Sequence, residues 1–158
     1  MLDPKELRRL MGHFATGVTI ITTRGADHTP YGLTANAFTS LSLDPPLCLV
    51  CVDRKAESFA HFYDSKCFTV NVLTHGQEAL STRFAKSGGD KFTGVKTIPG
   101  HHGAPLIDGA LAHIECRITD TLEGGDHVIH VGAIECFAVH TGDPLLFYQG
   151  RYRRLGDA

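Results

Sequence analysis

The sequence contains no run of about 18 apolar residues, and we therefore expect no membrane-spanning helix. It also lacks a basic excess: 15 Lys and Arg against 17 Asp and Glu give a formal net charge of −2, so we do not expect nucleic acid as a partner. The first ten residues mix acids and bases without an apolar stretch, which argues against a signal peptide. The odd number of cysteines, five, then predicts reduced thiols and a cytoplasmic location.

Familiar nucleotide and metal motifs are also missing. No Gly-x-Gly-x-x-Gly occurs, so a Rossmann-type nucleotide site is not expected. Cys48 and Cys51 match C-x-x-C, but residues three apart on a predicted strand face opposite sides and cannot easily share a metal or a disulfide. His101 and His102 have no carboxylate or cysteine at ligand spacing. We therefore expect no metal site.

The sequence that is present predicts one mostly β domain over residues 1–158 with peripheral helices. Hydrophobic periodicity predicts strands at residues 18–23, 31–43, 47–52, 68–73, 111–122, 127–140, 145–148 and 151–155. It predicts one helix that begins at Pro4 and ends before Gly17, two more at residues 56–64 and 77–86, and a long loop at 87–109. We expect the strand at 47–52 to be central and buried on both faces. Because regular β-α-β units are missing, the strands should form an antiparallel barrel.

The predicted strand over residues 31–43 has one polar and one apolar face if it is regular throughout. The polar face carries four short side chains, those of Thr34, Asn36, Ser40 and Ser42. The apolar set, which we expect to face the core, consists of Leu33, Ala35, Ala37 and Leu41. A solvent face is one interpretation. Solvent faces usually carry Lys, Glu or Arg, however, and none occurs here, so the polar face also suits a flat polar ligand that lies close to the backbone.

A second candidate site precedes the helix predicted at residue 56. Arg54 and Lys55 place two cations at a helix N-terminus, where they oppose the helix dipole by several tenths of a kcal/mol. A bound phosphate would reverse that sign, because it would contact one of these residues together with Ser58 and free backbone N–H groups. The alternative is two solvated surface charges. The sequence does not decide between Arg54 and Lys55 as the phosphate ligand.

The order and spacing of several motifs resemble the flavin reductase family of two-component monooxygenases, whose members have a flavin-binding split β-barrel. The motifs are FATGVTIIT at residues 14–22, GLTANAFTSLSLDPPL at 32–47, FTVNVL at 68–73, FA at 84–85, KF at 91–92, GDH at 125–127 and YQGRY at 148–152. The resemblance covers nearly the whole chain, without a large insertion or deletion. It implies an antiparallel split β-barrel, the FMN-binding split barrel, and a homodimer with FMN or FAD near the subunit interface.

The resemblance also implies site residues. The implied flavin contacts are Thr34, Ala35 through its backbone, Asn36, Ser40, Ser42, Cys51, Arg54, Lys55, Ser58, Phe84, Lys91 and Phe92. His127 is the implied catalytic residue, beside the nicotinamide, where it orients the carboxamide or helps to bind the reduced cofactor. The segment with Tyr148, Arg151 and Tyr152 lies near the same pocket, although Arg151 is equally well interpreted as a surface charge.

The implied activity is the transfer of a hydride from NADH or NADPH to FMN or FAD, followed by release of reduced flavin to a monooxygenase. Such a transfer needs stacked rings about 3–3.5 Å apart rather than an acid or a nucleophile, which agrees with the absence of a recognisable catalytic triad. Two alternatives remain open. One is a flavin-binding electron carrier of the same fold without NAD(P)H oxidation, and the other is a barrel that binds a different small molecule.

Overall fold

The computed structural model describes residues 1–156, and most of its elements are antiparallel strands. Seven strands form one sheet in the order β3-β2-β6-β9-β10-β5-β4. Their bounds are β2 Thr19–Arg24, β3 Pro30–Ala35, β4 Phe38–Leu43, β5 Pro46–Asp53, β6 Cys67–Val72, β9 Ala112–Gly124 and β10 His127–Val139. All pairings in this sheet are antiparallel, so the predicted mostly β, antiparallel fold class is confirmed.

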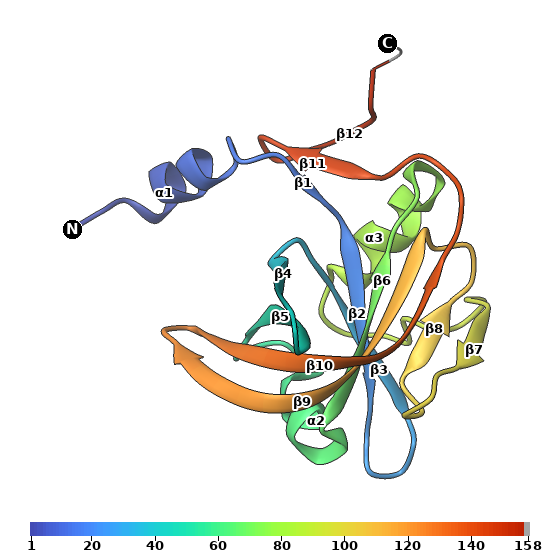
Figure 1. The fold of residues 1–158 in the computed structure, drawn as a ribbon. Helices are drawn as coiled ribbons and strands as arrows, with labels where there is room; N and C mark the ends of the chain where they lie inside the picture. The colour runs from blue at the N-terminus through green and yellow to red at the C-terminus, as the bar shows by residue number, and fades with distance from the viewer. Residues whose placement is uncertain (157–158) are drawn as a thin grey trace.

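The two edges of this sheet lie next to each other in the chain. β3 and β4 are its edge strands, and only Asn36 and Ala37 separate them. The backbone N–H of Cys51 on β5 donates to the Ala37 carbonyl at 2.9 Å, which fixes this corner against the neighbouring strand. The sheet therefore curls until its edges approach at residues 36–37, and Figure 1 shows the resulting split barrel.

Smaller elements surround the curved sheet. The helical ones are α1 Pro4–Met11, α2 Phe59–Ser65, the short 3₁₀ helix η1 His75–Gln77, and α3 Glu78–Phe84. Two small sheets consist of β1 Thr16–Gly17, β11 Leu146–Tyr148 and β12 Arg151–Arg153, and of β7 Thr97–Pro99 with β8 Pro105–Ile107. α1 extends away from the body in Figure 1, and none of its residues is buried. Within residues 1–156, no helix is long and apolar enough to cross a membrane.

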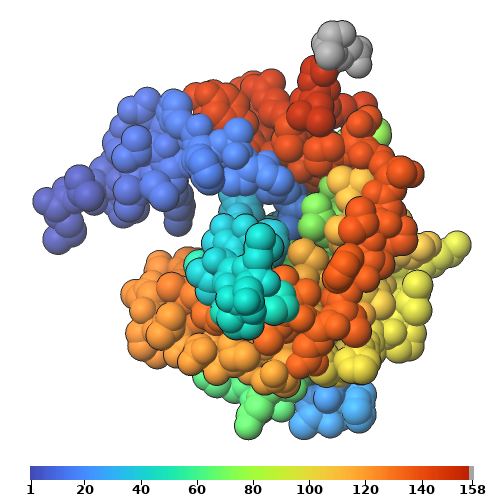
Figure 2. Space-filling view, in the orientation of Figure 1, coloured from blue at the N-terminus to red at the C-terminus, as the bar shows by residue number. Residues whose placement is uncertain are grey.

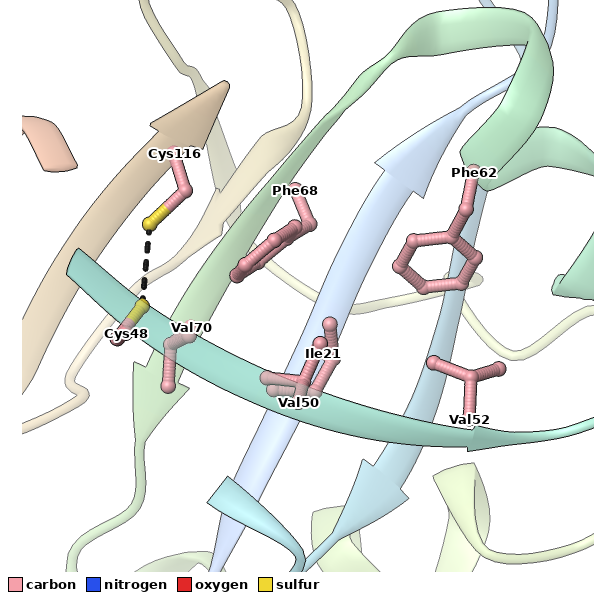
Figure 3. Packing of buried hydrophobic residues seen from close by; sticks show 8 residues of the cluster. All are labelled: Ile21, Cys48, Val50, Val52, Phe62, Phe68, Val70 and Cys116. Atoms are coloured by element: carbon pink, nitrogen blue, oxygen red, sulfur yellow. Dashed lines mark hydrogen bonds between the residues drawn. The ribbon is translucent and has the colours of Figure 1, made fainter. Parts of the chain in front are cut away.

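The main hydrophobic cluster lies inside the curved sheet. Its buried members are Ile21, Cys48, Val50, Val52, Phe62, Phe68, Val70 and Cys116 (Figure 3). The sulfur atoms of Cys48 and Cys116 are 3.4 Å apart, although β10 runs between their strands. They meet over Gly132 of β10, where an added Cβ would lie 2.7 Å from the Cβ of Cys116. Glycine at this position therefore lets the two strands pack their side chains together across the third.

A second cluster packs α3 against the other end of the sheet. Its buried members are Val18, Ile20, Leu73, Phe84, Ile107 and Leu145. Full burial of such a side chain contributes roughly 1.5–3 kcal/mol. Gly32 on β3 faces this helix, and a Cβ there would lie 2.9 Å from the Phe84 ring. The glycine allows α3 to lie directly on β3, which places the end of α3 beside the candidate site.

The prediction of one regular strand over residues 31–43 is wrong. The strand ends at Ala35 and resumes at Phe38, because the chain crosses there from one edge of the sheet to the other. A register shift between Ser40 and Ser42 breaks the alternation again. The expected apolar face is consequently only partly correct. Its members Leu33 and Ala35 pack against the main cluster, whereas Ala37 and Leu41 are exposed.

Three further expectations need correction. β5 is not a central strand buried on both faces: it lies beside the edge strand β4, and its side chains alternate between buried and more exposed. α1 ends at Met11 rather than near Gly17, because Gly12 caps the helix. The region 87–109 is not a structureless loop, because β7 and β8 form a hairpin within it. The long hairpin of β9 and β10 agrees with the prediction.

Candidate functional site

A cavity of about 250 Å³ lies where β3, the end of β5 and the C-terminal end of α3 meet. It is lined by Leu33, Thr34, Asp53, Lys55, Ala56, Glu57, Ser58, Phe84, Ala85, Lys86, Ser87 and Lys91, and we call it the lysine cavity. Five residues proposed from the sequence meet here: Thr34, Lys55, Ser58, Phe84 and Lys91. Three lysines against two carboxylates give the lining a net positive charge, which favours an anionic ligand.

The hydroxyl of Ser58 is the least satisfied polar group of this cavity. Ser58 is only 2% exposed, and its Oγ has no hydrogen-bond partner among residues 1–156. It occupies the N-cap position of α2 without capping the helix through its side chain. A buried polar group without a partner costs about 1–3 kcal/mol. An oxygen-rich ligand in the lysine cavity would remove that cost, so the residues fit the phosphate or ribityl part of a flavin.

The structure separates the two basic residues that precede α2. Arg54 forms an ion pair with Glu123 on β9 and donates through Nε to the Gly125 carbonyl at 3.2 Å. Lys55 lines the lysine cavity instead, and its side chain has no ion pair or hydrogen bond within the described part of the chain. α2 begins only at Phe59, three residues later than predicted, so the helix dipole contributes less here than expected from the sequence. Lys55 is therefore the better placed cation for an anionic ligand.

Lys91 enters the cavity from the segment after α3. Its Nζ donates to the carbonyls of Gly32 and Phe84, each at 3.4 Å, which holds the ammonium group at the cavity wall. Phe92 packs edge-on against Phe84, with ring centroids 5.0 Å apart. Phe92 also lines a neighbouring cavity of about 360 Å³, which shares Glu57, Ser58 and Lys91 with the lysine cavity. The two cavities thus adjoin at these shared side chains.

Thr34 links the site to the C-terminal hairpin of β11 and β12. Its Oγ1 donates to the backbone carbonyl of Ser81 on α3 at 2.6 Å. The hydroxyl of Ser81 in turn lies 2.7 Å from that of Tyr152 on β12. Tyr152 packs against the second core cluster, so its position is determined by packing as well as by this hydrogen bond. The predicted residues Thr34 and Tyr152 are therefore connected through α3, although they do not touch.

Asn36 lies in a different hollow, between the N-terminal segment and the corner of β3 and β4. This groove has a volume of about 380 Å³ and is lined by Phe14, Ala15, Thr16, Gly17, Val18, Thr19, Asn36, Phe38, Thr39 and Val72. Figure 2 shows the hollow between the blue N-terminal segment and the cyan segment of β4 and β5. The carbonyl of neighbouring Ala35 is not free here, because it accepts a hydrogen bond from Thr19 Oγ1 at 2.6 Å.

His127 begins β10 and pairs with Asp53 of β5. The backbone N–H of Arg54 donates to the Asp126 carbonyl at 3.0 Å, so the turn before His127 lies beside the segment that lines the lysine cavity. The Nδ1 of His127 is 2.7 Å from Asp126 Oδ1, and this hydrogen bond is the main reason why the pKa of the Asp126 carboxyl is lowered. An ionised carboxylate at Nδ1 favours the tautomer with a proton on Nδ1, which leaves Nε2 as an acceptor.

The remaining predicted residues line neither the lysine cavity, nor the cavity beside it, nor the groove at Asn36. Ser40 is exposed and Ser42 is half-buried on the edge strand β4, and neither lines the lysine cavity or the groove at Asn36. Cys51 is half-buried on β5, and burial raises the pKa of its thiol. Tyr148 and Arg151 face each other across the β11–β12 turn, and Arg151 is exposed.

Sequence reasoning missed Lys86 and Ser87, which complete one wall of the lysine cavity directly after α3. The available signal was their place between the FA and KF motifs, in a stretch that also contains Gly88 and Gly89. Both glycines have positive φ, +84° and +75°, which is the backbone conformation that glycine allows. The turn that they form leads the chain back to Lys91.

A family model described as a flavin reductase like domain matches residues 11–156. The chain belongs to the flavin reductase family. Several proteins that are similar to this chain in sequence are named as reductases. It is 43% identical over 151 residues to a reductase component from Rhodococcus opacus, named for a 4-nitrophenol 4-monooxygenase/4-nitrocatechol 2-monooxygenase; the match covers 96% of this chain and 80% of that protein. It is 44% identical over 164 residues to an NADH-dependent FAD reductase from Streptomyces globisporus, covering 98% and 89% of the two chains.

Solved structures of flavin reductases have the same architecture. A structure of an NADH:FAD oxidoreductase from Streptomyces globisporus, in complex with NAD and FAD fragments, superposes with a TM-score of 0.91. It is 43% identical in sequence, and the match covers 99% of this chain and 96% of that one. The flavin reductase PheA2 in its native state has a TM-score of 0.90 at 38% identity, covering 99% and 100%. The family assignment and split-barrel fold predicted from the sequence are thereby confirmed.

Proposed function

We propose that this member of the flavin reductase family transfers a hydride from NADH or NADPH to FMN or FAD and supplies the reduced flavin to a monooxygenase. The relatives support both parts, because they include NADH-dependent flavin reductases and reductase components of monooxygenases. The observation in this chain that carries the proposal is the lysine cavity with its buried, unpartnered Ser58 hydroxyl. An oxygen-rich anion would balance the lysines and give this hydroxyl a partner, and the phosphate of a flavin nucleotide is such a group.

Lys55 and Ser58 hold the flavin phosphate in this proposal, and Lys91 supports the same wall. The charge-assisted hydrogen bond from a lysine is worth about 1.5–3 kcal/mol at such a position. Arg54 instead fixes the β9–β10 turn through Glu123 and Gly125. Thr34, Asn36 and the backbone of Ala35 lie along the remaining length of the flavin. Ser40, Ser42, Cys51, Phe84 and Phe92 stay proposed contacts on the strength of the family resemblance.

His127 is proposed to orient the nicotinamide. With its Nδ1 bonded to Asp126, its Nε2 is an acceptor suited to the amide N–H₂ of a carboxamide. Arg151 is proposed to meet a phosphate of NAD(P)H, with Tyr148 and Tyr152 beside it. When bound, the flavin supplies the hydride acceptor. The protein contributes by holding the hydride donor and acceptor in the geometry of transfer, since positioning can lower the activation free energy by several kcal/mol.

The chain is further proposed to act as a homodimer in the cytoplasm. Apolar side chains of the N-terminal segment support the dimer: Leu10 is 64% exposed, Met11 66% and Phe14 78%. An apolar surface of this kind commonly marks an interface. The proposed location rests on the five cysteines, all of which are free thiols in the structure.

A single assay distinguishes the proposed reductase from its two alternatives. Purified protein is mixed with FMN or FAD, flavin binding is measured by fluorescence quenching, and NADH absorbance is then followed. Loss of NADH that depends on exchangeable flavin supports the reductase. Tight flavin binding without NADH oxidation would identify an electron carrier, and no binding at micromolar flavin would identify a barrel for another ligand.

A further inference from the structure

A group of metal-ligating side chains lies apart from the lysine cavity and the Asn36 groove. His101 and His102 occupy the turn between β7 and β8, and Glu135 lies on β10. One ligand atom of each residue lies within 4.8 Å of the others. We propose that these three side chains form a binding site for a divalent transition-metal ion, of which Zn²⁺ is the representative case.

The fold brings the carboxylate to the histidines through a β-bulge. Ile134 of β10 pairs with Cys116 of β9, and Cys136 pairs with the adjacent Glu115. Glu135 is therefore an extra residue between two successive pairs. A bulge of this kind redirects a side chain that regular alternation would place elsewhere. Here it directs Glu135 outward to the β7–β8 turn, so that residues more than thirty positions apart in the chain share one point on the surface.

The turn that carries the histidines is held in place by its neighbours. The His102 carbonyl accepts hydrogen bonds from Arg24 Nε at 2.7 Å and from the Cys67 thiol at 3.7 Å. The backbone N–H of His101 donates to the carboxylate of Glu115. Gly100 also donates to the Ala104 carbonyl at 3.1 Å, which closes the turn. The ligands are thus presented by a fixed backbone, and binding an ion would order little besides side-chain rotamers.

The donor set has the chemistry of a transition-metal site. His102 Nε2 lies 2.6 Å from Glu135 Oε2, while Arg117 Nε binds the other carboxylate oxygen at 2.7 Å. Imidazole nitrogen with carboxylate oxygen suits Zn²⁺ and its neighbours, whose bonds to these atoms measure about 2.0–2.2 Å. An ion would replace the direct hydrogen bond between His102 and Glu135, and His101 would turn toward it. Arg117 would remain as the outer partner that orients the carboxylate.

A bound ion would link the β7–β8 turn to the long hairpin of β9 and β10. Because ligands that bind only the folded state stabilise it, metal should raise the melting temperature without being required for flavin reduction. The Glu135 carboxylate already has a cationic partner in Arg117, so we expect micromolar rather than nanomolar affinity. The site is independent of the proposed reductase activity.

The test uses full-length protein freed of metal with a chelator and then titrated with Zn²⁺ by calorimetry. We expect one ion per chain with a micromolar Kd, and at least a tenfold weaker Kd in His102→Ala and Glu135→Gln. His140→Ala is the matched control, because His140 is also exposed but lies outside the group, and its affinity should equal that of the unaltered chain. Flavin binding by each variant checks that it is folded, and Glu135→Gln retains hydrogen-bonding capacity toward His102.

Co²⁺ provides a second readout that identifies the ligands. A visible absorption band from bound Co²⁺ should form with the unaltered chain and disappear in the double variant His101→Ala and His102→Ala. Absence of stoichiometric binding by the unaltered chain would overturn the proposal. Binding that persists unchanged in both His102→Ala and Glu135→Gln would overturn it too, because the ion would then occupy another site.

Discussion

Arg54 and Glu123 form an ion pair that turns the guanidinium away from the lysine cavity, while Lys55, the next residue, lines it. The two adjacent cations therefore lie in different surroundings. The pair also connects β5 to the β9–β10 turn, at whose end His127 begins β10. The structure thus separates the positions of two residues that charge alone does not distinguish.

The first prediction concerns these two cations. Lys55→Gln should weaken flavin binding by about tenfold or more, because it removes one charge-assisted contact to phosphate. Arg54→Gln is the matched control and should change the flavin Kd by less than about threefold. Flavin fluorescence titration measures both. Equal losses in the two variants, or a larger loss in Arg54→Gln, would refute the assignment of the phosphate to Lys55.

The second prediction separates binding from stability at Ser58. Ser58→Ala removes a buried hydroxyl that has no partner, so the free energy of unfolding without flavin should stay within about 0.5 kcal/mol or rise. Flavin affinity should nevertheless fall. Thr22→Val is the contrasting variant: its hydroxyl donates to the Pro105 carbonyl and accepts from Asn71, so it should lose about 1–3 kcal/mol of stability with flavin binding retained. Urea unfolding of flavin-free protein distinguishes these outcomes.

The third prediction tests the role of His127. His127→Ala should raise the KM for NADH more than it raises the flavin Kd, because the side chain is assigned to the nicotinamide. Asp126→Asn should have a smaller effect of the same kind, since it removes the carboxylate that favours one imidazole tautomer. Steady-state kinetics with saturating flavin measures both. A His127→Ala variant with weaker flavin binding and unchanged NADH kinetics would disprove the role.

The fourth prediction concerns the dependence of stability on pH. His130 is fully buried against Phe62 and Tyr63, its Nδ1 lies 3.0 Å from the Thr121 hydroxyl, and burial lowers its pKa to about 4. The unfolded chain, with a histidine pKa of about 6.5, therefore binds the proton first as the pH falls. Neutral His130 therefore contributes fully to the free energy of unfolding above about pH 6.5. This contribution falls by up to about 3 kcal/mol between about pH 6.5 and 4.

Urea unfolding at pH 7 and pH 5 measures this effect directly. The unaltered chain should lose about 2 kcal/mol more between these two pH values than His130→Phe, whose ring cannot be protonated. The same pH-dependent loss in both proteins would show that other groups cause the destabilisation. Comparing the two slopes is necessary because the variant also changes packing and hence absolute stability.

The fifth prediction concerns the proposed homodimer. Replacing Leu10 and Phe14 together with Glu should convert the dimer to a monomer, because charges would replace exposed apolar side chains of the N-terminal segment. Ile98→Glu is the control, since Ile98 is also exposed, at 56%, and its strand β7 lies on the opposite side of the molecule from α1 in Figure 1. Light scattering after size-exclusion chromatography gives the mass. A dimer that survives the double change would place the interface elsewhere.

Local patterns predicted most of the strands but not how the sheet closes. The strand at 18–23 and the hairpin of β9 and β10 follow from residue type and turn composition, which act over a few positions. The break at Asn36 and Ala37 does not, because alternation continues across a point where the chain passes between opposite sheet edges. Pairing partners decide that break, and they are distant in sequence.

The candidate sites show the same division. That Lys55 and Ser58 lie close together follows from their neighbouring positions in the chain, whereas the different surroundings of Arg54 and Lys55 depend on Glu123 from another strand. No carboxylate lies at ligand spacing from His101 and His102 in the sequence, because Glu135 reaches them only through a bulge in β10. Spacing along the chain cannot reveal ligands that tertiary structure brings together.

Hydride transfer from NADH to flavin is the central claim, and anaerobic stopped-flow absorbance measures it directly. Protein with one equivalent of FMN or FAD is mixed with NADH, and the flavin and nicotinamide bands are recorded together. Direct hydride transfer predicts that both bands decay at one rate and that NADH deuterated at the transferred position slows this decay. Flavin that binds to the protein but remains oxidised throughout would contradict it.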